Sequence, residues 1–295
     1  MREVSLCIFA NFFIDNEVRF QRMKDSFYSF RDVLPSQWVV NIRGSLKEET
    51  AHFLHSQLND DIQFSFIDTK HGWATDSLYI SSQIRSKYTM IWIEDHLLVS
   101  NIKYFSSVVY DADINNVDQI IYSWFVHKDG YESLKNLYVS DFINVYCIDR
   151  SVLRCIHEKR LVDFNSTSLC SIYKTSFFVD LLKCRKPFLR RWPTKLPFEL
   201  EHLVTDVIKE SIITAYPNNE LFASIDDDHG KPGYSLISRG MYNDNVSRED
   251  ILKLEYRSNF KHLNFLKRFA LFINLYTYLH PVINFILRLK YTFYG

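Results

Sequence analysis

Glycine is scarce in this chain: its 295 residues include only seven glycines. The commonest nucleotide-binding loops depend on glycine, because their backbone must come very close to a phosphate group. Neither the GxGxxG pattern of dinucleotide-binding folds nor the GxxxxGK[S/T] pattern of phosphate-binding loops occurs. The sequence therefore argues against a dinucleotide-binding domain and against a P-loop nucleotidase.

Cysteine is equally sparse. The five cysteines are odd in number and widely spaced, and none belongs to a CxxC pair: Cys7, Cys147, Cys155, Cys170 and Cys184. This spacing excludes a zinc ribbon and argues against a disulfide scaffold, so we expect reduced thiols in a cytosolic protein. A serine hydrolase is also disfavoured, since there is no GxSxG motif.

Net charge is absent as well. Lys+Arg and Asp+Glu both number 35, and the pI is about 7.1. Nucleic-acid-binding proteins usually carry a basic excess, so no nucleic-acid partner is expected. The N-terminus runs straight into a strand-like segment without the apolar h-region of a signal peptide, and we expect the chain to stay in the cytoplasm.

Strand-like and helix-like segments alternate through the first hundred residues. Asp15 and Asn16 are candidates to cap the first helix, because their side chains can accept hydrogen bonds from free backbone N–H groups. The pattern predicts strands over 4–13, 38–42, 62–67 and 88–93, and helices over 17–31, 46–58 and 77–86. Four strands separated by single helices predict a doubly wound, mostly parallel α/β sheet.

The run YTMIWIEDH, residues 88–96, is the most distinctive stretch. An apolar, strand-like segment ends abruptly in Glu94, Asp95 and His96. Open α/β sheets bind ligands at the carboxyl ends of their strands, and carboxylates there can hold a divalent cation against phosphate oxygens. An acidic strand-to-loop turn without any ligand would show the same residues, so this run alone leaves both interpretations open.

The second half is less regular. Asn101 would cap a further helix. We predict strands over 119–125 and 139–148, a strand or loop and then a helix over 166–183, a basic proline-containing loop over 185–193, a helix from about 199 to 213, and a turn-rich loop over 225–233.

The C-terminal tail has a different character. From Phe269 to Leu287 there is no Asp, Glu, Lys or Arg, and basic residues flank this stretch on both sides. Its length approaches the roughly 20 residues that span a bilayer, but two asparagines, a histidine and a proline interrupt it. We therefore predict an amphipathic helical tail on the membrane surface, with packing against the core or a true span as alternatives.

The order of elements resembles the nucleotide-sugar-binding half of GT-A glycosyltransferases. The stretch from Gly72 through Ser77 to the acidic turn is similar to that family's approach to its DxD motif. Glu94-Asp95-His96 is not a literal Asp-x-Asp and looks more like a Glu-Asp-Asp variant with histidine in the last place. The resemblance implies a GT-A-like catalytic domain over 1–258, with a nucleotide-binding half at 1–100 and an acceptor half at 101–258, followed by the tail at 259–295.

The resemblance also implies roles for individual residues in the donor site. Asp95 would bind Mn²⁺ or Mg²⁺ across the diphosphate, and Glu94 would contact the ribose or the metal. The other expected nucleotide-sugar-binding residues are Asn11, Phe12 and Phe13 around the nucleoside, Arg43 and Asp68 at the base or ribose, and Asp76. A divalent cation would neutralise the charge that develops on a nucleoside diphosphate leaving group.

Two further roles would come from the second half. Members of this fold often take a later metal ligand there, and His229 in the cluster at 226–230 is the candidate. Its loop could close over the donor, or be a solvated acidic turn. An inverting enzyme also needs a carboxylate base, for which Glu201 and then Glu199 are the candidates, although helix N-termini favour acids in any case.

These expectations combine into a glycosyltransferase that moves a sugar from a nucleotide-sugar donor to a glycan or lipid-linked acceptor. The tail would hold it peripherally on the inner face of the membrane, where a lipid-linked substrate is concentrated. One alternative is a sugar-phosphate nucleotidyltransferase, which shares the layout but usually has a glycine-rich N-terminal loop, whereas residues 10–16 contain no glycine. The other is a non-catalytic α/β binding module docked on membranes by its tail.

Overall fold

The computed structural model describes residues 4–58, 62–69, 72–123, 131, 134–149, 151–152, 167–183, 211–228 and 232–243. The chain divides into two compact units, Met1–Val246 and Ser247–Gly295, and every described residue belongs to the first. Glu199, Glu201, His229 and the tail at 259–295 lie outside the described residues, so the predictions made for them stay predictions. Within the described ranges, no helix is both long enough and apolar enough to cross a bilayer.

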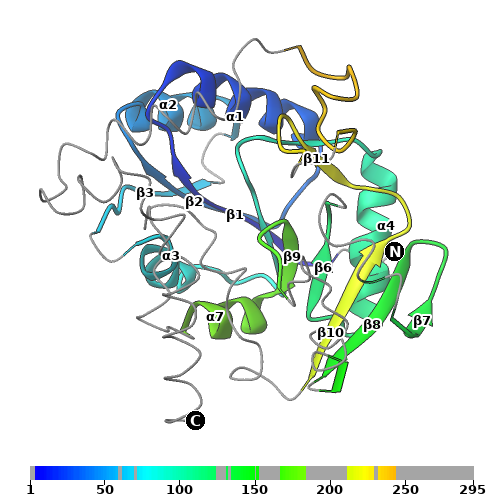
Figure 1. The fold of residues 1–295 in the computed structure, drawn as a ribbon. Helices are drawn as coiled ribbons and strands as arrows, with labels where there is room; N and C mark the ends of the chain where they lie inside the picture. Colours follow the sequence, from blue (N-terminus) through cyan, green and yellow to red (C-terminus); the bar gives the residue numbers. More distant parts are fainter. Residues whose placement is uncertain are drawn as a thin grey trace, which may run out of the picture. The chain divides into compact units, whose positions relative to one another are not determined.

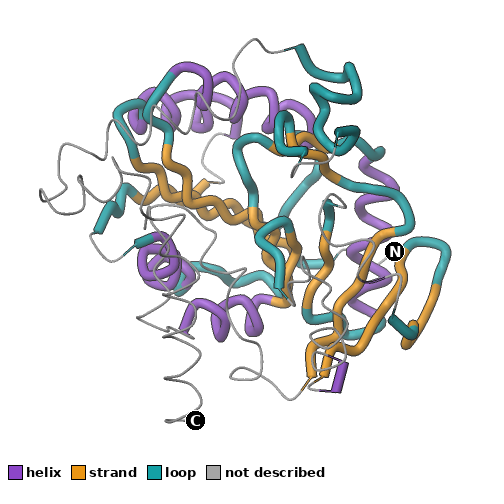
Figure 2. Tube along the Cα trace, viewed as in Figure 1, coloured by secondary structure: helices purple, strands orange, loops and turns teal. Residues whose placement is uncertain are grey.

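A nine-stranded sheet runs through the first unit in the order β3-β2-β1-β4-β9-β6-β10-β8-β7 (Figures 1 and 2). Its strands are β1 (Leu6–Phe13), β2 (Gln37–Arg43), β3 (Ile62–Ser65), β4 (Tyr88–Ile91), β6 (Gln119–Ile121), β7 (Asn136–Val139), β8 (Ile143–Asp149), β9 (Ser171–Lys174) and β10 (Ser211–Pro217). Strands β3, β2, β1 and β4 pair in parallel, while β9 is antiparallel to both its neighbours. The predicted doubly wound, mostly parallel α/β sheet is confirmed.

Helices cover both faces of the sheet (Figure 1). They are α1 (Glu17–Phe30), α2 (Lys47–Leu58), α3 (Trp73–Ser81), α4 (Ile102–Ile114) and α7 (Thr175–Lys183). Because successive strand residues point to opposite faces, β1 supplies both halves of the core. Ile8, Ala10 and Phe12 pack in a cluster with α1, α2 and α4, whereas Cys7 and Phe9 pack with α3 and α7.

Two helix starts agree with the predicted caps. The Asn16 side chain accepts a hydrogen bond from the Arg19 backbone N–H at 3.0 Å and opens α1. Asn101 accepts one from the Tyr104 N–H at 2.8 Å and opens α4. Such caps satisfy donors that the first helical turn leaves unpaired.

Several element boundaries differ from the sequence-based prediction. Helix α3 begins at Trp73 rather than 77, because Gly72, with φ of 96°, lets the chain turn there and its carbonyl accepts the Asp76 N–H. The predicted single strand over 139–148 is the β7–β8 hairpin. The helix predicted to continue to 213 was wrong at its end: Ser211 begins β10, whose Ile-Ile-Thr sequence favours a strand.

The acidic turn also differs in detail. Strand β4 ends at Ile91, and Glu94 and Asp95 form a turn before the short strand β5 (His96–Leu98). Strand β5 pairs antiparallel with β11 (Phe222–Ser224) in a separate two-stranded sheet. This second sheet brings the residues after Ser224 close to the acidic turn, since the Ile225 N–H donates to the Asp95 carbonyl at 2.8 Å.

Candidate functional site

A small cavity lies at the carboxyl ends of β1, β2 and β4. It is lined by Asn11, Phe12, Phe13, Arg19, Arg43, Trp73, Ile91, Trp92, Ile93, Glu94 and Leu169. The strand order reverses between β1 and β4, and open α/β sheets bind ligands at such a switch point. Five of the predicted donor-site residues therefore meet at one place: Asn11, Phe12, Phe13, Arg43 and Glu94.

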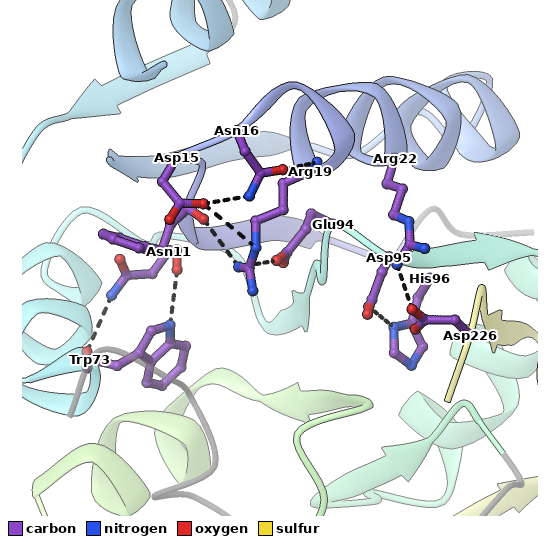
Figure 3. Close-up of polar contacts among 11 residues, drawn as sticks. Asn11, Asp15, Asn16, Arg19, Arg22, Trp73, Glu94, Asp95, His96 and Asp226 are labelled. Atoms are coloured by element: carbon purple, nitrogen blue, oxygen red, sulfur yellow. Dashed lines mark hydrogen bonds and ion pairs between the residues drawn. The ribbon is translucent and has the colours of Figure 1, made fainter. Parts of the chain in front are cut away.

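Asn11 is the centre of a buried hydrogen-bond network at the floor of the cavity. Its side-chain oxygen accepts hydrogen bonds from Asn41 Nδ2 at 2.9 Å and from Arg43 Nε at 3.0 Å. Its amide nitrogen donates to the Ser77 hydroxyl and to the Trp73 carbonyl. The Trp73 indole returns a bond to the Asn11 carbonyl at 3.0 Å (Figure 3). The network fixes the orientation of Arg43, since a buried polar group keeps the position that satisfies it.

The two aromatic residues after Asn11 differ in their surroundings. The Phe12 ring packs into the core against Trp92, with ring centroids 4.7 Å apart. The Arg43 guanidinium lies over the ring of Phe13, 5.7 Å from its centroid. Phe13 and Arg43 thus form one wall of the cavity, and an arginine on an aromatic face is held by cation–π attraction.

Asp68 and Asp76 are not among the residues that line the cavity. Asp68 is exposed after β3. Asp76 is fully buried in α3, where it accepts hydrogen bonds from the Thr69 hydroxyl at 2.5 Å and the Thr69 N–H at 3.2 Å. Burial raises the pKa of Asp76, while Thr69 and Arg43 oppose the rise. The predicted contact of Asp68 and Asp76 with the donor stays a prediction.

Arg19 was missed by the sequence analysis. Its Nη1 donates to Glu94 Oε1 at 3.1 Å and to the Phe13 carbonyl at 3.2 Å. Figure 3 shows Arg19 and Arg22 pointing from α1 toward Glu94 and Asp226. The sequence did carry a signal, because both arginines fall on the helical face that also buries Met23, Ser26, Phe27 and Phe30. A charged residue on a buried helical face needs a partner. Trp73 and Leu169 also line the cavity and were not among the predicted site residues.

The acidic turn presents three side chains with different partners. Burial raises the pKa of Glu94, and the charge of Asp95 adds to this, while Arg19 opposes it. His96 is buried, with Nδ1 2.7 Å from Asp95 Oδ1 and Nε2 3.3 Å from Cys170 Sγ. Burial lowers the pKa of His96, but Cys170 and Asp95 together raise it well above 6.5. His96 therefore holds Asp95 in place from inside the fold.

The loop after β11 is firmly anchored where the structure describes it. Asp226 Oδ2 is 2.8 Å from Arg22 Nη1, and both side chains are buried. Asp228 accepts hydrogen bonds from the Tyr234 and Ser235 N–H groups at 3.1 and 2.8 Å. Residues 226–228 are therefore held by specific contacts while Asp227 and Asp228 stay half-buried, and the neighbouring His229 lies outside the described residues.

No complete divalent cation site is present among the described residues. Nowhere among them are three His, Cys, Asp or Glu side chains grouped so that they could hold an ion. Glu94 is ion-paired with Arg19 and Asp226 with Arg22, and both ring nitrogens of His96 are hydrogen-bonded. Of the two predicted ligands, Asp95 and His229, only Asp95 is described.

Comparison with known proteins bears on the fold alone. No protein-family model matches the chain, and no curated protein matches it. Solved structures with a similar fold include Staphylococcus aureus TarS 1–349 (10% identity, 75% of this chain and 60% of that chain, TM-score 0.49) and its complex with UDP-GlcNAc (11%, 74% and 58%, 0.47). The mannosyltransferase PcManGT from Pyrobaculum calidifontis, in complex with GDP-Man and Mn²⁺, is also similar (12%, 78% and 58%, 0.45).

The chain spans less than two thirds of the length of these structures. At such identities a shared fold says nothing about substrate. The α/β fold of this chain is defined by its own features: the parallel order β3-β2-β1-β4, the cavity between β1 and β4, and the acidic turn that follows β4.

Proposed function

We propose that this protein is a glycosyltransferase that moves a sugar from a nucleotide-sugar donor to an acceptor hydroxyl. The observation that carries the proposal is the cavity at the switch point between β1 and β4, with Glu94 of the acidic turn on its wall beside Asn11 and Arg43. Fold and cavity together support donor binding at this place.

The chemistry of the lining suits a nucleoside linked to phosphates. Phe13 offers an aromatic surface for the nucleoside, and Glu94 offers carboxylate oxygens that can accept hydrogen bonds from ribose hydroxyls. Arg19 and Arg43 bring two guanidinium groups to the same cavity. Guanidinium groups bind phosphate oxygens with paired hydrogen bonds and stabilise the negative charge that develops when a nucleoside diphosphate leaves.

The acceptor side of the proposal rests on residues outside the described ranges. Glu201, or else Glu199, would take the proton from the acceptor hydroxyl if the enzyme is inverting. The tail at 259–295 would hold the enzyme on the inner face of the membrane, where a lipid-linked saccharide is the expected acceptor. A glycan that is not linked to lipid is the alternative acceptor.

A test by product release distinguishes this proposal from the nucleotidyltransferase alternative. The whole chain is incubated in millimolar Mn²⁺ with UDP-GlcNAc, UDP-glucose, GDP-mannose and dTDP-glucose together with a lipid extract that contains lipid-linked saccharides. The expected result is release of a nucleoside diphosphate from one donor. Nucleoside triphosphate formed only when pyrophosphate is added would favour the nucleotidyltransferase instead.

Matched variants connect that activity to the cavity. Glu94→Gln removes a carboxylate that lines the cavity, whereas Glu48→Gln removes an exposed one on α2. We expect release to fall about tenfold or more in the first variant, since a hydrogen bond to a charged group is lost, and to stay unchanged in the second. Equal activity in both variants, or no release from any donor, would overturn the proposal.

A further inference from the structure

The Arg19 guanidinium lies among oxygen atoms that could also be ligands of a hard metal ion. Its Nη1 is 3.1 Å from Glu94 Oε1 and 3.2 Å from the Phe13 carbonyl oxygen, and its Nε is 3.8 Å from Asp15 Oδ1. Carboxylate and backbone carbonyl oxygens are the usual ligands of Mg²⁺ and Ca²⁺. A fixed positive charge of the chain itself therefore sits between the end of β1 and the acidic turn (Figure 3).

The packing around Arg19 fixes the position of its side chain. Its side chain is only 9% exposed, and the Asn16 cap fixes the first turn of α1 from which it projects. Arg19 and Glu94 both line the cavity, so their ion pair is part of its wall. A guanidinium stays charged at every pH at which the protein is folded, and it has five N–H donors to share between the protein and a ligand.

We propose that Arg19 supplies the positive charge that binds the donor's diphosphate, and that the protein therefore binds its nucleotide without a divalent cation. The inference rests on the proposed function, because it concerns the same cavity. It opposes the sequence-based prediction of a Mn²⁺ or Mg²⁺ site, so one experiment decides between the two.

Arg43 is a second guanidinium that lines the cavity. Its Nε donates to Asn11 Oδ1 at 3.0 Å, and its side chain is 2% exposed, so its orientation is fixed as well. Two guanidinium groups line the cavity with one carboxylate, Glu94, so the charged side chains of its lining leave an excess of one positive charge. Paired hydrogen bonds from guanidinium to phosphate add direction as well as charge.

The test compares nucleotide affinity with and without metal. Binding of UDP, GDP, CDP and dTDP to the whole chain is measured by calorimetry, once in excess EDTA and once with millimolar Mn²⁺. We expect one of them to bind with the same affinity, within about twofold, under both conditions. Arg19→Gln should weaken that binding about tenfold or more in both, because a charged hydrogen-bond donor is lost.

Control variants separate this role from a structural one. Arg31→Gln removes an exposed arginine just after α1 and should leave binding unchanged. Arg19→Gln alone leaves Glu94 without its ion-pair partner, so Arg19→Gln/Glu94→Gln is measured beside it, with Glu94→Gln as its reference. In that pair, loss of Arg19 should again lower affinity for the diphosphate and leave affinity for the parent nucleoside unchanged.

The outcomes are distinguishable. Binding by the native chain that requires Mn²⁺ would overturn the inference and leave the proposed function standing. Binding by Arg19→Gln as tight as that of the native chain would overturn it too. If none of the four nucleotides binds under either condition, the proposed function fails and the inference fails with it.

Discussion

Arg22 and Asp226 form a buried ion pair across 204 positions of sequence, with 2.8 Å between Nη1 and Oδ2. Arg22 lies one turn beyond Arg19 on α1, and Asp226 follows β11. Since β11 pairs with β5, directly after the acidic turn, the ion pair ties this turn to the helix that carries Arg19. The two long-range pairs, Arg19–Glu94 and Arg22–Asp226, thus hold one helix against one edge of the candidate site.

Removing one partner of this pair should be costly. The side chains of Arg22 and Asp226 are 3% and 4% exposed, so Asp226→Ala leaves a charge in the interior. We expect the free energy of unfolding, measured in urea, to fall by about 3–5 kcal/mol. Asp32→Ala breaks an exposed pair with Arg31 and should cost less than about 1 kcal/mol. Similar losses of unfolding free energy in both variants would contradict the burial of the Arg22–Asp226 pair.

Gly44 should tolerate substitution less well than Gly240. Both have positive φ, of 99° and 67°, which costs a residue with a side chain about 1–3 kcal/mol. A Cβ at Gly44 would lie 2.2 Å from the Ile14 carbonyl oxygen, whereas one at Gly240 meets nothing within 4 Å. Gly44→Ala should therefore lower the free energy of unfolding by clearly more than Gly240→Ala.

The same substitution should also disturb the cavity. The Ile14 N–H donates to the Arg43 carbonyl at 2.9 Å, so a shift of Ile14 moves both Phe13 and Arg43. Nucleotide affinity should fall in Gly44→Ala at temperatures where the variant is still folded, and stay unchanged in Gly240→Ala. Equal stability of the two variants would contradict the close approach of Gly44 to Ile14.

Asp76 should make stability depend on pH in a defined direction. Its pKa is raised above the ordinary 3.8, chiefly by burial. The stability that such a group contributes is present below pH 3.8 and is lost as the pH rises through its folded pKa. As the pH rises through the folded pKa of Asp76, the free energy of unfolding of the native chain should therefore fall relative to that of Asp76→Asn. A flat difference would contradict the raised pKa, and Asp180→Asn, which changes an exposed carboxylate, is the control.

Much of the fold of the first hundred residues was predictable because its signals are local. The alternation of apolar runs with capped helices depends on neighbouring residues, and Asn16 caps α1 as predicted. The carboxyl ends of parallel strands meet at one edge, and the resemblance to GT-A glycosyltransferases implied that Asn11, Arg43 and Glu94 lie together there.

The remaining features depend on contacts that are remote in sequence. Arg19 falls on the buried face of α1, but its partner Glu94 is 75 positions away in the sequence, so their ion pair could not be predicted. The burial of Asp226 depends in the same way on Arg22. The start of β10 was missed because β-branched residues such as Ile212 and Ile213 are also compatible with a buried helix end, and only pairing with β8 decides between the two.

We expect the cavity between β1 and β4 to bind a nucleoside diphosphate. The most direct test of this binding is thermal unfolding of the whole chain in millimolar Mn²⁺ with UDP, GDP, CDP and dTDP, repeated on Glu94→Gln and Glu48→Gln. A nucleotide at a hundred times its dissociation constant should add about 2.7 kcal/mol of stability. We expect a rise in melting temperature with one nucleotide that is retained in Glu48→Gln and largely lost in Glu94→Gln. No rise with any nucleotide, or an equal rise in both variants, would contradict it.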